Sequence, residues 1–193
     1  MTIEKIWQEL AVGDSQRKHP YHVPAIATVS PTQSARVRTV VLRASSQEGR
    51  IVQFHTDMRS PKVTEIRDNS SVAALFYNPE TKFQLRISGV AVVHHEDSIA
   101  DSAWEKTRLL SRRCYLSTPP GEPLNKQNFG LPEKLTGRQP TEKESAAARV
   151  NFGVVRITVE EIDALELHYS GHKRHLFSWD ERLQQFKSIE LVP

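Results

Sequence analysis

The chain of 193 residues has few of the features that mark secreted, membrane or metal-binding proteins. Cys114 is its single cysteine, which excludes an internal disulfide and any site built from several cysteine ligands. No apolar run approaches the roughly 20 residues needed to span a bilayer. Residues 1–7 lack the basic and apolar regions of a signal peptide. We therefore expect a cytoplasmic protein that does not enter a membrane.

The chain also lacks a large net charge, because it has 26 Lys and Arg residues and 23 Asp and Glu residues. The cations gather in small clusters at 36–43, 108–113 and 172–174, which suit a small anion better than nucleic acid. No glycine-rich dinucleotide loop, P-loop or serine nucleophile elbow occurs. His94 and His95 would point to opposite faces of a strand, so no metal site is expected.

Hydrophobic residues follow the period of strands along most of the chain. The clearest case is 83–88, where Phe83, Leu85 and Ile87 alternate with polar residues and are expected to face the interior. Strands are predicted at 22–29, 36–44, 50–56, 71–77, 82–94, 151–158, 163–169, 173–179 and 184–191. Helices are predicted at 2–11, 60–68 and 98–113. The expected fold is a single domain over 1–193, mainly β, an antiparallel barrel or sandwich with peripheral helices.

One long segment breaks this pattern. Residues 117–149 contain five prolines and no hydrophobic periodicity. A stretch of this length without regular structure is typical of a flexible loop or of a lid over a functional site.

Two neighbouring stretches suggest a receptor for phosphate. A regular strand over 36–43 would place Arg36 and Arg38 on one face and Arg43 on the other, and arginine matches phosphate well. The next helix is expected to begin at Ser60-Pro61, where its N–H groups attract anions and Arg59 and Lys62 add charge. Taken singly, each cation could be an ordinary surface residue, but together they favour phosphate binding.

These stretches resemble the pyridoxamine 5′-phosphate oxidase family, the FMN-binding split barrels. The family's Arg-x-Val-Leu-Leu-Lys corresponds to residues 38–43, and its Tyr-Thr-Asn followed by Ser-Arg-Lys corresponds to 55–57 and 60–62. Its glutamine before a Val-x-Val-x-Gly strand corresponds to Gln84-Leu85-Arg86-Ile87-Ser88-Gly89. The resemblance implies an antiparallel split β-barrel and covers residues 25–95, with weaker similarity towards the C-terminus.

The resemblance also implies FMN as the cofactor. Arg38, Ser60 and Lys62 would hold its phosphate, with Arg59 replacing the arginine that the family has at Pro61. The flavin ring and ribityl chain would lie along the remaining matched positions, which are Thr39, Val40, Val41, Arg43, His55, Thr56 and Gln84. In such folds the flavin sits between two subunits, so a homodimer with FMN at the subunit interface is implied.

The substrate residues of the family are matched less closely. Its Tyr, Arg and Ser at helical spacing correspond to Trp104, Arg108 and Arg112, so the arginine alone is kept. The first arginine of its C-terminal motif is kept as Arg174. The resemblance thus makes Arg43, Arg108 and Arg174 the candidates for recognising a small anionic substrate.

The leading hypothesis is an FMN-dependent oxidoreductase that passes a hydride between this unassigned substrate and the flavin. One alternative is a genuine pyridoxamine or pyridoxine 5′-phosphate oxidase. Another, of a different class, is a flavin- or haem-binding carrier or sensor without turnover.

Overall fold

The computed structural model describes residues 1–124 and 130–193 and contains one antiparallel sheet of nine strands in this part of the chain. Seven strands follow the order β2-β1-β5-β6-β7-β4-β3, and the β8–β9 hairpin extends the sheet from β7. The predicted mainly β antiparallel architecture with peripheral helices is therefore confirmed. The strands are β1 Ala25–Val29, β2 Ala35–Thr39, β3 Leu42–Ser46, β4 Ile51–Asp57, β5 Ser71–Asn78, β6 Phe83–His94, β7 Phe152–Glu166, β8 Lys173–Asp180 and β9 Gln185–Leu191.

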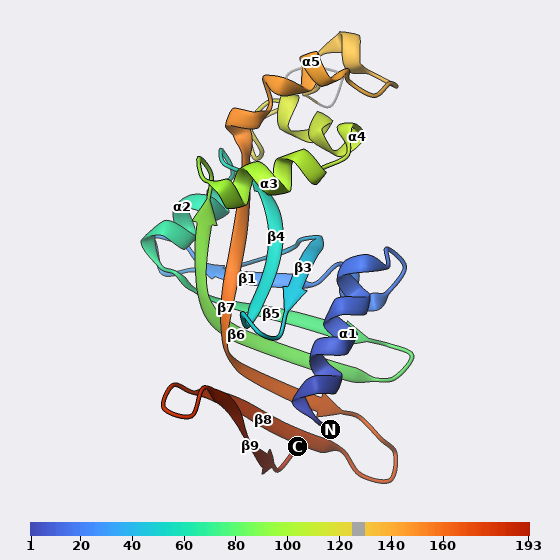
Figure 1. Cartoon of the computed structure of the whole chain (residues 1–193), viewed down its shortest axis with the longest axis vertical. Coiled ribbons are helices and arrows are strands. Elements are labelled where there is room, and N and C mark those ends of the chain that lie inside the picture. The colour runs from blue at the N-terminus through green and yellow to red at the C-terminus, as the bar shows by residue number, and fades with distance from the viewer. Residues whose placement is uncertain (125–129) are drawn as a thin grey trace.

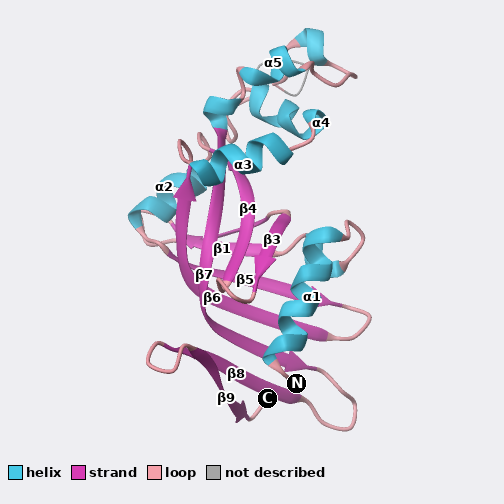
Figure 2. Ribbon diagram, viewed as in Figure 1, coloured by secondary structure: helices cyan, strands magenta, loops and turns pink. Residues whose placement is uncertain are grey.

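The helices lie around this sheet. They are α1 Ile3–Ser15, α2 Pro61–Asp68, α3 Ser98–Lys106, α4 Leu109–Arg112 and α5 Glu142–Ala146, with 3-10 turns at Pro20–His22, Arg113–Leu116, Glu133–Leu135 and Arg149–Asn151. Figure 1 shows α3, α4 and α5 gathered at one end of the molecule, with the β8–β9 hairpin and both termini at the other. Figure 2 shows that α1 lies alongside the middle of the sheet.

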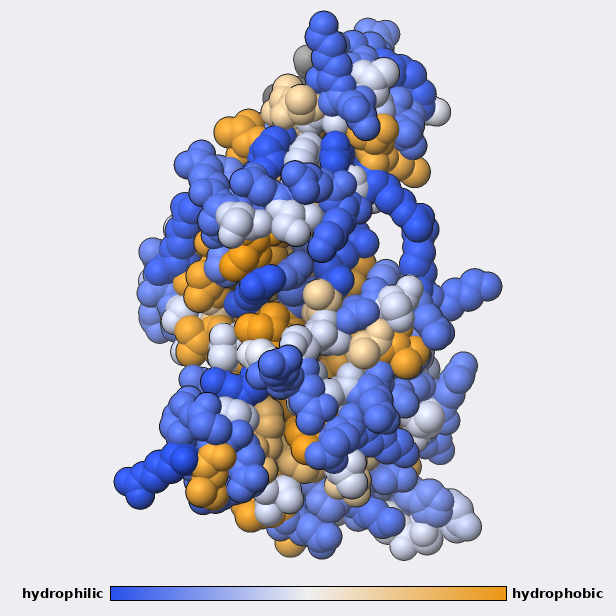
Figure 3. All heavy atoms as spheres, in the orientation of Figure 1, coloured by the Kyte–Doolittle hydropathy of each residue, from blue (hydrophilic) through white to orange (hydrophobic). Residues whose placement is uncertain are grey.

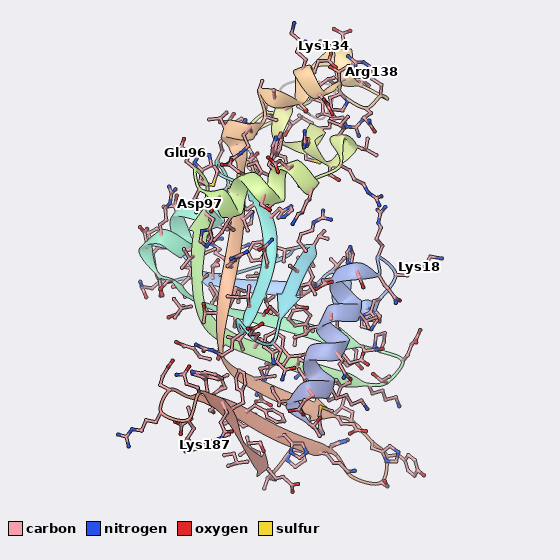
Figure 4. All side chains as sticks on the ribbon, in the orientation of Figure 1. Lys18, Glu96, Asp97, Lys134, Arg138 and Lys187 are labelled. Atoms are coloured by element: carbon pink, nitrogen blue, oxygen red, sulfur yellow. The ribbon has the colours of Figure 1, made fainter. Side chains whose placement is uncertain are left out.

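Labelled charged residues mark the two ends of the molecule in Figure 4. Lys134 and Arg138 lie at the helical end, and Lys187 lies on the hairpin at the opposite end (Figure 4). The surface in this view is mostly hydrophilic, with apolar side chains in scattered patches (Figure 3). Among the described residues, no helix is long and apolar enough to cross a membrane.

The main core lies between α1 and the inner faces of the strands. Helix α1 begins where predicted, since the hydroxyl of Thr2 accepts a hydrogen bond from the N–H of Lys5 at 3.4 Å. Its apolar side Ile6, Trp7 and Leu10 is buried against the sheet. The alternation predicted for 83–88 is also confirmed, because the apolar positions of β6 are buried while its polar positions reach the surface. Burial of these apolar faces is the main force that holds the sheet and α1 together.

The strand predicted over 36–44 is wrong as a single element. Strand β2 pairs with β1, whereas β3 pairs with β4 at the far edge of the sheet, so the chain crosses between them at Val40 and Val41. The N–H of Val40 donates to the carbonyl of Pro24 at 3.0 Å, outside the ladder of β2. Arg38 and Arg43 therefore belong to different strands.

Two further predictions are corrected. The strands expected at 151–158 and 163–169 form one strand, β7, because a bulge opposite Ser88 and Gly89 accommodates Glu160 without ending the pairing. The helix expected over 98–113 ends at Lys106, and Thr107 takes an extended conformation before Arg108 precedes α4. The hydroxyl of Thr107 bonds the carbonyl of Ala103 at 2.8 Å, which closes the last turn of α3.

The segment 117–149 contains short helical elements where the structure describes it. Helix α5 opens with a capping box, in which Thr141 and Glu144 satisfy each other's backbone N–H groups. Part of the predicted loop, residues 125–129, lies outside the described residues. The flexibility of the segment stays a prediction.

Candidate functional site

The first candidate site lies at the start of α2, where Ser60 is the N-cap residue and Pro61 the first helical residue, as predicted. The hydroxyl of Ser60 does not cap the helix; it accepts a hydrogen bond from Nζ of Lys62 at 2.9 Å. Nζ of Lys62 also lies 3.3 Å from the hydroxyl of Thr56, which is 3.2 Å from that of Ser60. We call Arg38, Thr56, Ser60 and Lys62 the phosphate cradle.

The ammonium of Lys62 has no carboxylate partner in the described part of the chain. Burial lowers its pKa, and the neighbouring charge of Arg38 lowers it further, while Asp57 and Glu65 offset part of this change. A half-buried cation held by two hydroxyls is stabilised by an anion placed beside it. The helix N-terminus favours an anion at the same point.

Arg38 is fixed at the wall of the cradle by Glu65 on the buried face of α2. Its Nη2 donates to Oε2 of Glu65 at 2.7 Å, and Thr28 bonds both side chains. Burial raises the pKa of Glu65, but the hydrogen bonds from Thr28 and Arg38 outweigh that effect and lower it overall. Sequence reasoning missed Thr28 and Glu65, because both lie far from Arg38 in the chain.

Arg59, predicted to contact the phosphate, is engaged elsewhere. Its Nε and Nη2 donate to the two carboxylate oxygens of Asp57 at 2.9 and 2.7 Å. This pair raises the pKa of Arg59, mainly through the hydrogen bond to Asp57. A role for Arg59 at the cofactor stays a prediction.

A second candidate site is a cleft of about 990 Å³ between the end of α1, strands β3, β4 and β7, and helices α3 and α4. It brings together four predicted residues, Val41, Arg43, His55 and Arg108. The imidazole of His55 packs edge-on against Phe152, with ring centres 4.8 Å apart. Burial, together with the charge of Arg43, lowers the pKa of His55 to about 4, so this imidazole is neutral at neutral pH.

Three more of the predicted residues lie on the outer face of the sheet. Thr39 pairs with Ala25 on the edge, and Gln84 and Arg174 occupy facing positions on either side of Leu165. Arg174 donates to Asp163 through Nε at 3.0 Å and Nη2 at 2.7 Å. Arg86 also pairs with Asp163, whose pKa is lowered mainly by the hydrogen bond from Arg174.

Most of the predicted residues thus form three separate groups in this chain: the phosphate cradle, the cleft and the outer sheet face. Two belong to none of them, since Val40 packs against the core and Arg59 is held by Asp57. The cradle offers one ammonium, two hydroxyls and a guanidinium, a donor set that fits a phosphate monoester such as that of FMN. No group of three or more metal-ligating side chains occurs among residues 1–124 and 130–193.

Residues 4–95 match the family described as the pyridoxamine 5′-phosphate oxidase FMN-binding domain. Pyridoxine/pyridoxamine 5′-phosphate oxidase 2 of Arabidopsis thaliana is 29% identical over 140 residues, which are 67% of this chain and 70% of that protein. The pyridoxine/pyridoxamine 5′-phosphate oxidase of Acinetobacter baumannii (strain SDF) is 31% identical over 101 residues, 52% of this chain. The match spans 45% of the Acinetobacter protein, less than half of its length.

Solved structures share the fold over the whole chain. A pyridoxamine 5′-phosphate oxidase-related, FMN-binding protein from Nostoc punctiforme PCC 73102 has a TM-score of 0.78 at 21% identity, covering 100% of this chain and 99% of that one. PhzG from Burkholderia lata 383, solved with tetrahydrophenazine-1-carboxylic acid, has a TM-score of 0.75 at 21% identity, covering 99% and 92%. The chain therefore has the split-barrel fold of these structures, and its residues 4–95 match the pyridoxamine 5′-phosphate oxidase FMN-binding domain family.

Proposed function

We propose that residues 1–193 act as one FMN-binding domain that catalyses hydride transfer between FMN and a small anionic substrate. The observation that carries this proposal is the ammonium of Lys62, half-buried against the hydroxyls of Thr56 and Ser60 at a helix N-terminus. FMN, when bound, supplies the redox chemistry, and the protein supplies binding, orientation and charge.

The chain's own residues divide this work. Lys62 and Arg38 neutralise the phosphate, and Ser60 offers it a hydroxyl that the helix does not use. In the cleft, Arg43 and Arg108 attract the anionic substrate, while neutral His55 offers a hydrogen bond without adding charge. The walls of the cleft exclude part of the water, which strengthens these electrostatic interactions.

The proposal includes a homodimer with FMN at the subunit interface. The outer sheet face exposes apolar side chains that a second copy would cover, with Val37 68%, Leu75 41% and Tyr77 43% exposed. Gln84 and Arg174 lie on this same face, away from the phosphate cradle of their own protomer. In the proposed dimer, Gln84 and Arg174 of each copy would lie at the cofactor held by the other. Sedimentation of the FMN-loaded protein as a monomer would contradict this arrangement.

Comparing FMN with riboflavin tests the cradle, because the two flavins differ by the phosphate. Two charge-assisted hydrogen bonds at about 1.5 kcal/mol each imply roughly a hundredfold tighter binding of FMN. Lys62→Met should lower this preference for FMN at least about tenfold and leave the affinity for riboflavin unchanged. Lys134→Met, an exposed lysine at the helical end, is the matched control. Flavin fluorescence titration gives both affinities; equal binding of the two flavins, or full retention of FMN by Lys62→Met, would refute the proposal.

A second candidate is oxidation of pyridoxamine or pyridoxine 5′-phosphate itself. The curated relatives named above carry this activity in their names, and Arg108, the arginine kept from the family's substrate helix, lines the cleft. Incubation of the FMN-loaded protein with either substrate decides the matter, since formation of pyridoxal phosphate supports this activity and its absence excludes it. Bound FMN that no donor reduces would instead indicate a carrier or sensor.

A further inference from the structure

A second anion-binding position lies on the floor of the cleft, at a residue that the family motifs do not include. Arg156 of β7 stands opposite Gln53 of β4 in the ladder, and both line the cleft. Nε of Arg156 donates to Oε1 of Gln53 at 2.9 Å. Gln53 is only 8% exposed, so this bond holds the guanidinium against a buried amide.

The bond to Gln53 leaves the outer edge of Arg156 available. Among the described residues, neither Nη atom of Arg156 has a hydrogen-bond partner, and Arg156 forms no ion pair. A guanidinium presents its two Nη donors in a rigid plane that matches the oxygens of a carboxylate or a phosphate. Because Arg156 is partly buried, such an oxyanion would bind it more strongly than it would bind an exposed arginine.

The charges around Arg156 also favour binding of an anion. Five cations line the cleft, Arg17, Arg43, Lys106, Arg108 and Arg156, and none of them forms an ion pair within the part of the chain that the structure describes. Among the described residues that line the cleft, Asp14 is the single acidic one, and its carboxylate accepts a hydrogen bond from Ser45 at 2.8 Å. The cleft therefore has a strong positive potential that an anionic ligand would relieve.

This position is separate from the phosphate cradle. Successive side chains of β4 point to opposite faces of the sheet, so Gln53 and His55 face the cleft while Thr56 faces the cradle. None of the cradle residues lines the cleft. One strand thus separates two anion-binding positions.

Resting on the proposed function, we infer that Arg156, oriented by Gln53, binds an oxyanion of the substrate, a carboxylate or a phosphate, on the floor of the cleft. Arg156 is the binding residue and Gln53 a positioning residue. The rim cations Lys106 and Arg108 are exposed and attract the same anion from solution.

Calorimetric titration of the FMN-loaded protein with benzoate, phenyl phosphate and neutral benzyl alcohol tests this inference. The unmodified protein should bind one or both anions at least about tenfold more tightly than benzyl alcohol, and the tighter anion identifies the group recognised. Arg156→Met should lose that preference, and Arg156→Lys should lose part of it because the planar fork is gone. Arg182→Met, an exposed arginine on the β8–β9 hairpin, should behave like the unmodified protein.

A second variant tests the inference even if Arg156→Met does not fold. Gln53→Glu places a carboxylate against Arg156 and should weaken anion binding in the same way without removing the arginine. The preference for FMN over riboflavin should stay within about twofold in every variant, because the cradle that would hold the phosphate lies on the other side of β4. Anion binding by Arg156→Met and Gln53→Glu at the affinity of the unmodified protein would overturn the inference, as would equal binding of anions and benzyl alcohol. If the protein does not bind FMN, the proposed function fails, and the same titration of the flavin-free protein still decides the role of Arg156.

Discussion

Acidification from pH 7.5 to pH 5.0 should destabilise the folded protein through His55. Burial and the charge of Arg43 lower its pKa in the folded state to about 4, against 6.5 for an ordinary histidine. Between these values the unfolded chain binds a proton at this imidazole and the folded protein does not. The free energy of unfolding therefore falls as the pH falls below 6.5, and this contribution is constant above that pH.

The size of the effect follows from the width of the window. One pH unit corresponds to about 1.36 kcal/mol for each proton, so at pH 5.0, about 1.5 units below 6.5, His55 should lower the free energy of unfolding by about 2 kcal/mol. In a chain of this length such a loss lowers the melting temperature by roughly 4–8 °C. The carboxyl groups of Glu65 and Asp163 have lowered pKa values, so they remain ionised at pH 5.0 and lose their stabilising contribution only at lower pH.

Urea denaturation at pH 7.5, 6.5 and 5.0 measures this loss, on flavin-free protein because the phosphate of FMN titrates near pH 6. His55→Asn removes the titrating group and should lose about 2 kcal/mol less than the unmodified protein between pH 7.5 and 5.0. His168→Asn, at an exposed histidine, should leave the full pH dependence in place. An equal loss in the unmodified protein and in His55→Asn would refute the assignment.

Two substitutions test the packing that supports the sites. Glu65→Gln leaves the guanidinium of Arg38 without its carboxylate and should lower the free energy of unfolding by about 1–3 kcal/mol, measured by urea denaturation; an unchanged midpoint would show that the pair contributes nothing. Gly89→Ala would place a Cβ 2.1 Å from the carbonyl oxygen of Thr158 and should destabilise by about 3 kcal/mol or more. Gly49→Ala meets the side chains of Ile51 at 3.2 Å and Ser46 at 3.6 Å and no backbone atom among its nearest neighbours, so its melting temperature should change little; similar shifts in both alanine variants would contradict this account.

The sequence predicted those elements whose signal is local. Helix α2 was predicted because the Ser60-Pro61 start is contained in two adjacent residues, and β6 because its alternation runs without a break through 83–88. The crossing at Val40 and Val41 was missed, since β-branched residues favour extended backbone whether the strand continues or changes partner. The continuity of β7 was missed because the polar residues near Glu160 suggest a turn, whereas the bulge that accommodates them depends on β6.

In the candidate sites, too, the sequence predicted what depends on local motifs and missed what depends on tertiary packing. The cations of the cradle could be named from motifs, but their partners could not, because Thr28 and Glu65 meet Arg38 only after β1, β2 and α2 pack together. Arg156 gave no signal in the sequence, where it is the one charged residue of the predicted strand 151–158. The role inferred for Arg156 depends on its position opposite Gln53, and this pairing forms only when β4 and β7 come together in the folded protein.

Under the proposed function, strand β4 separates binding of the phosphate on one face of the sheet from binding of the substrate on the other. Its register against β7 runs from Ile51 opposite Thr158 to Asp57 opposite Phe152. A slip by one residue would exchange the two faces, moving Thr56 to the cleft and His55 to the cradle side. While the register holds, substitutions at the cleft positions Gln53 and His55 alter the ligand chemistry of the cleft without touching the cradle. Under the proposed function, a chain can therefore keep the residues of the phosphate cradle and bind a different anion in the cleft.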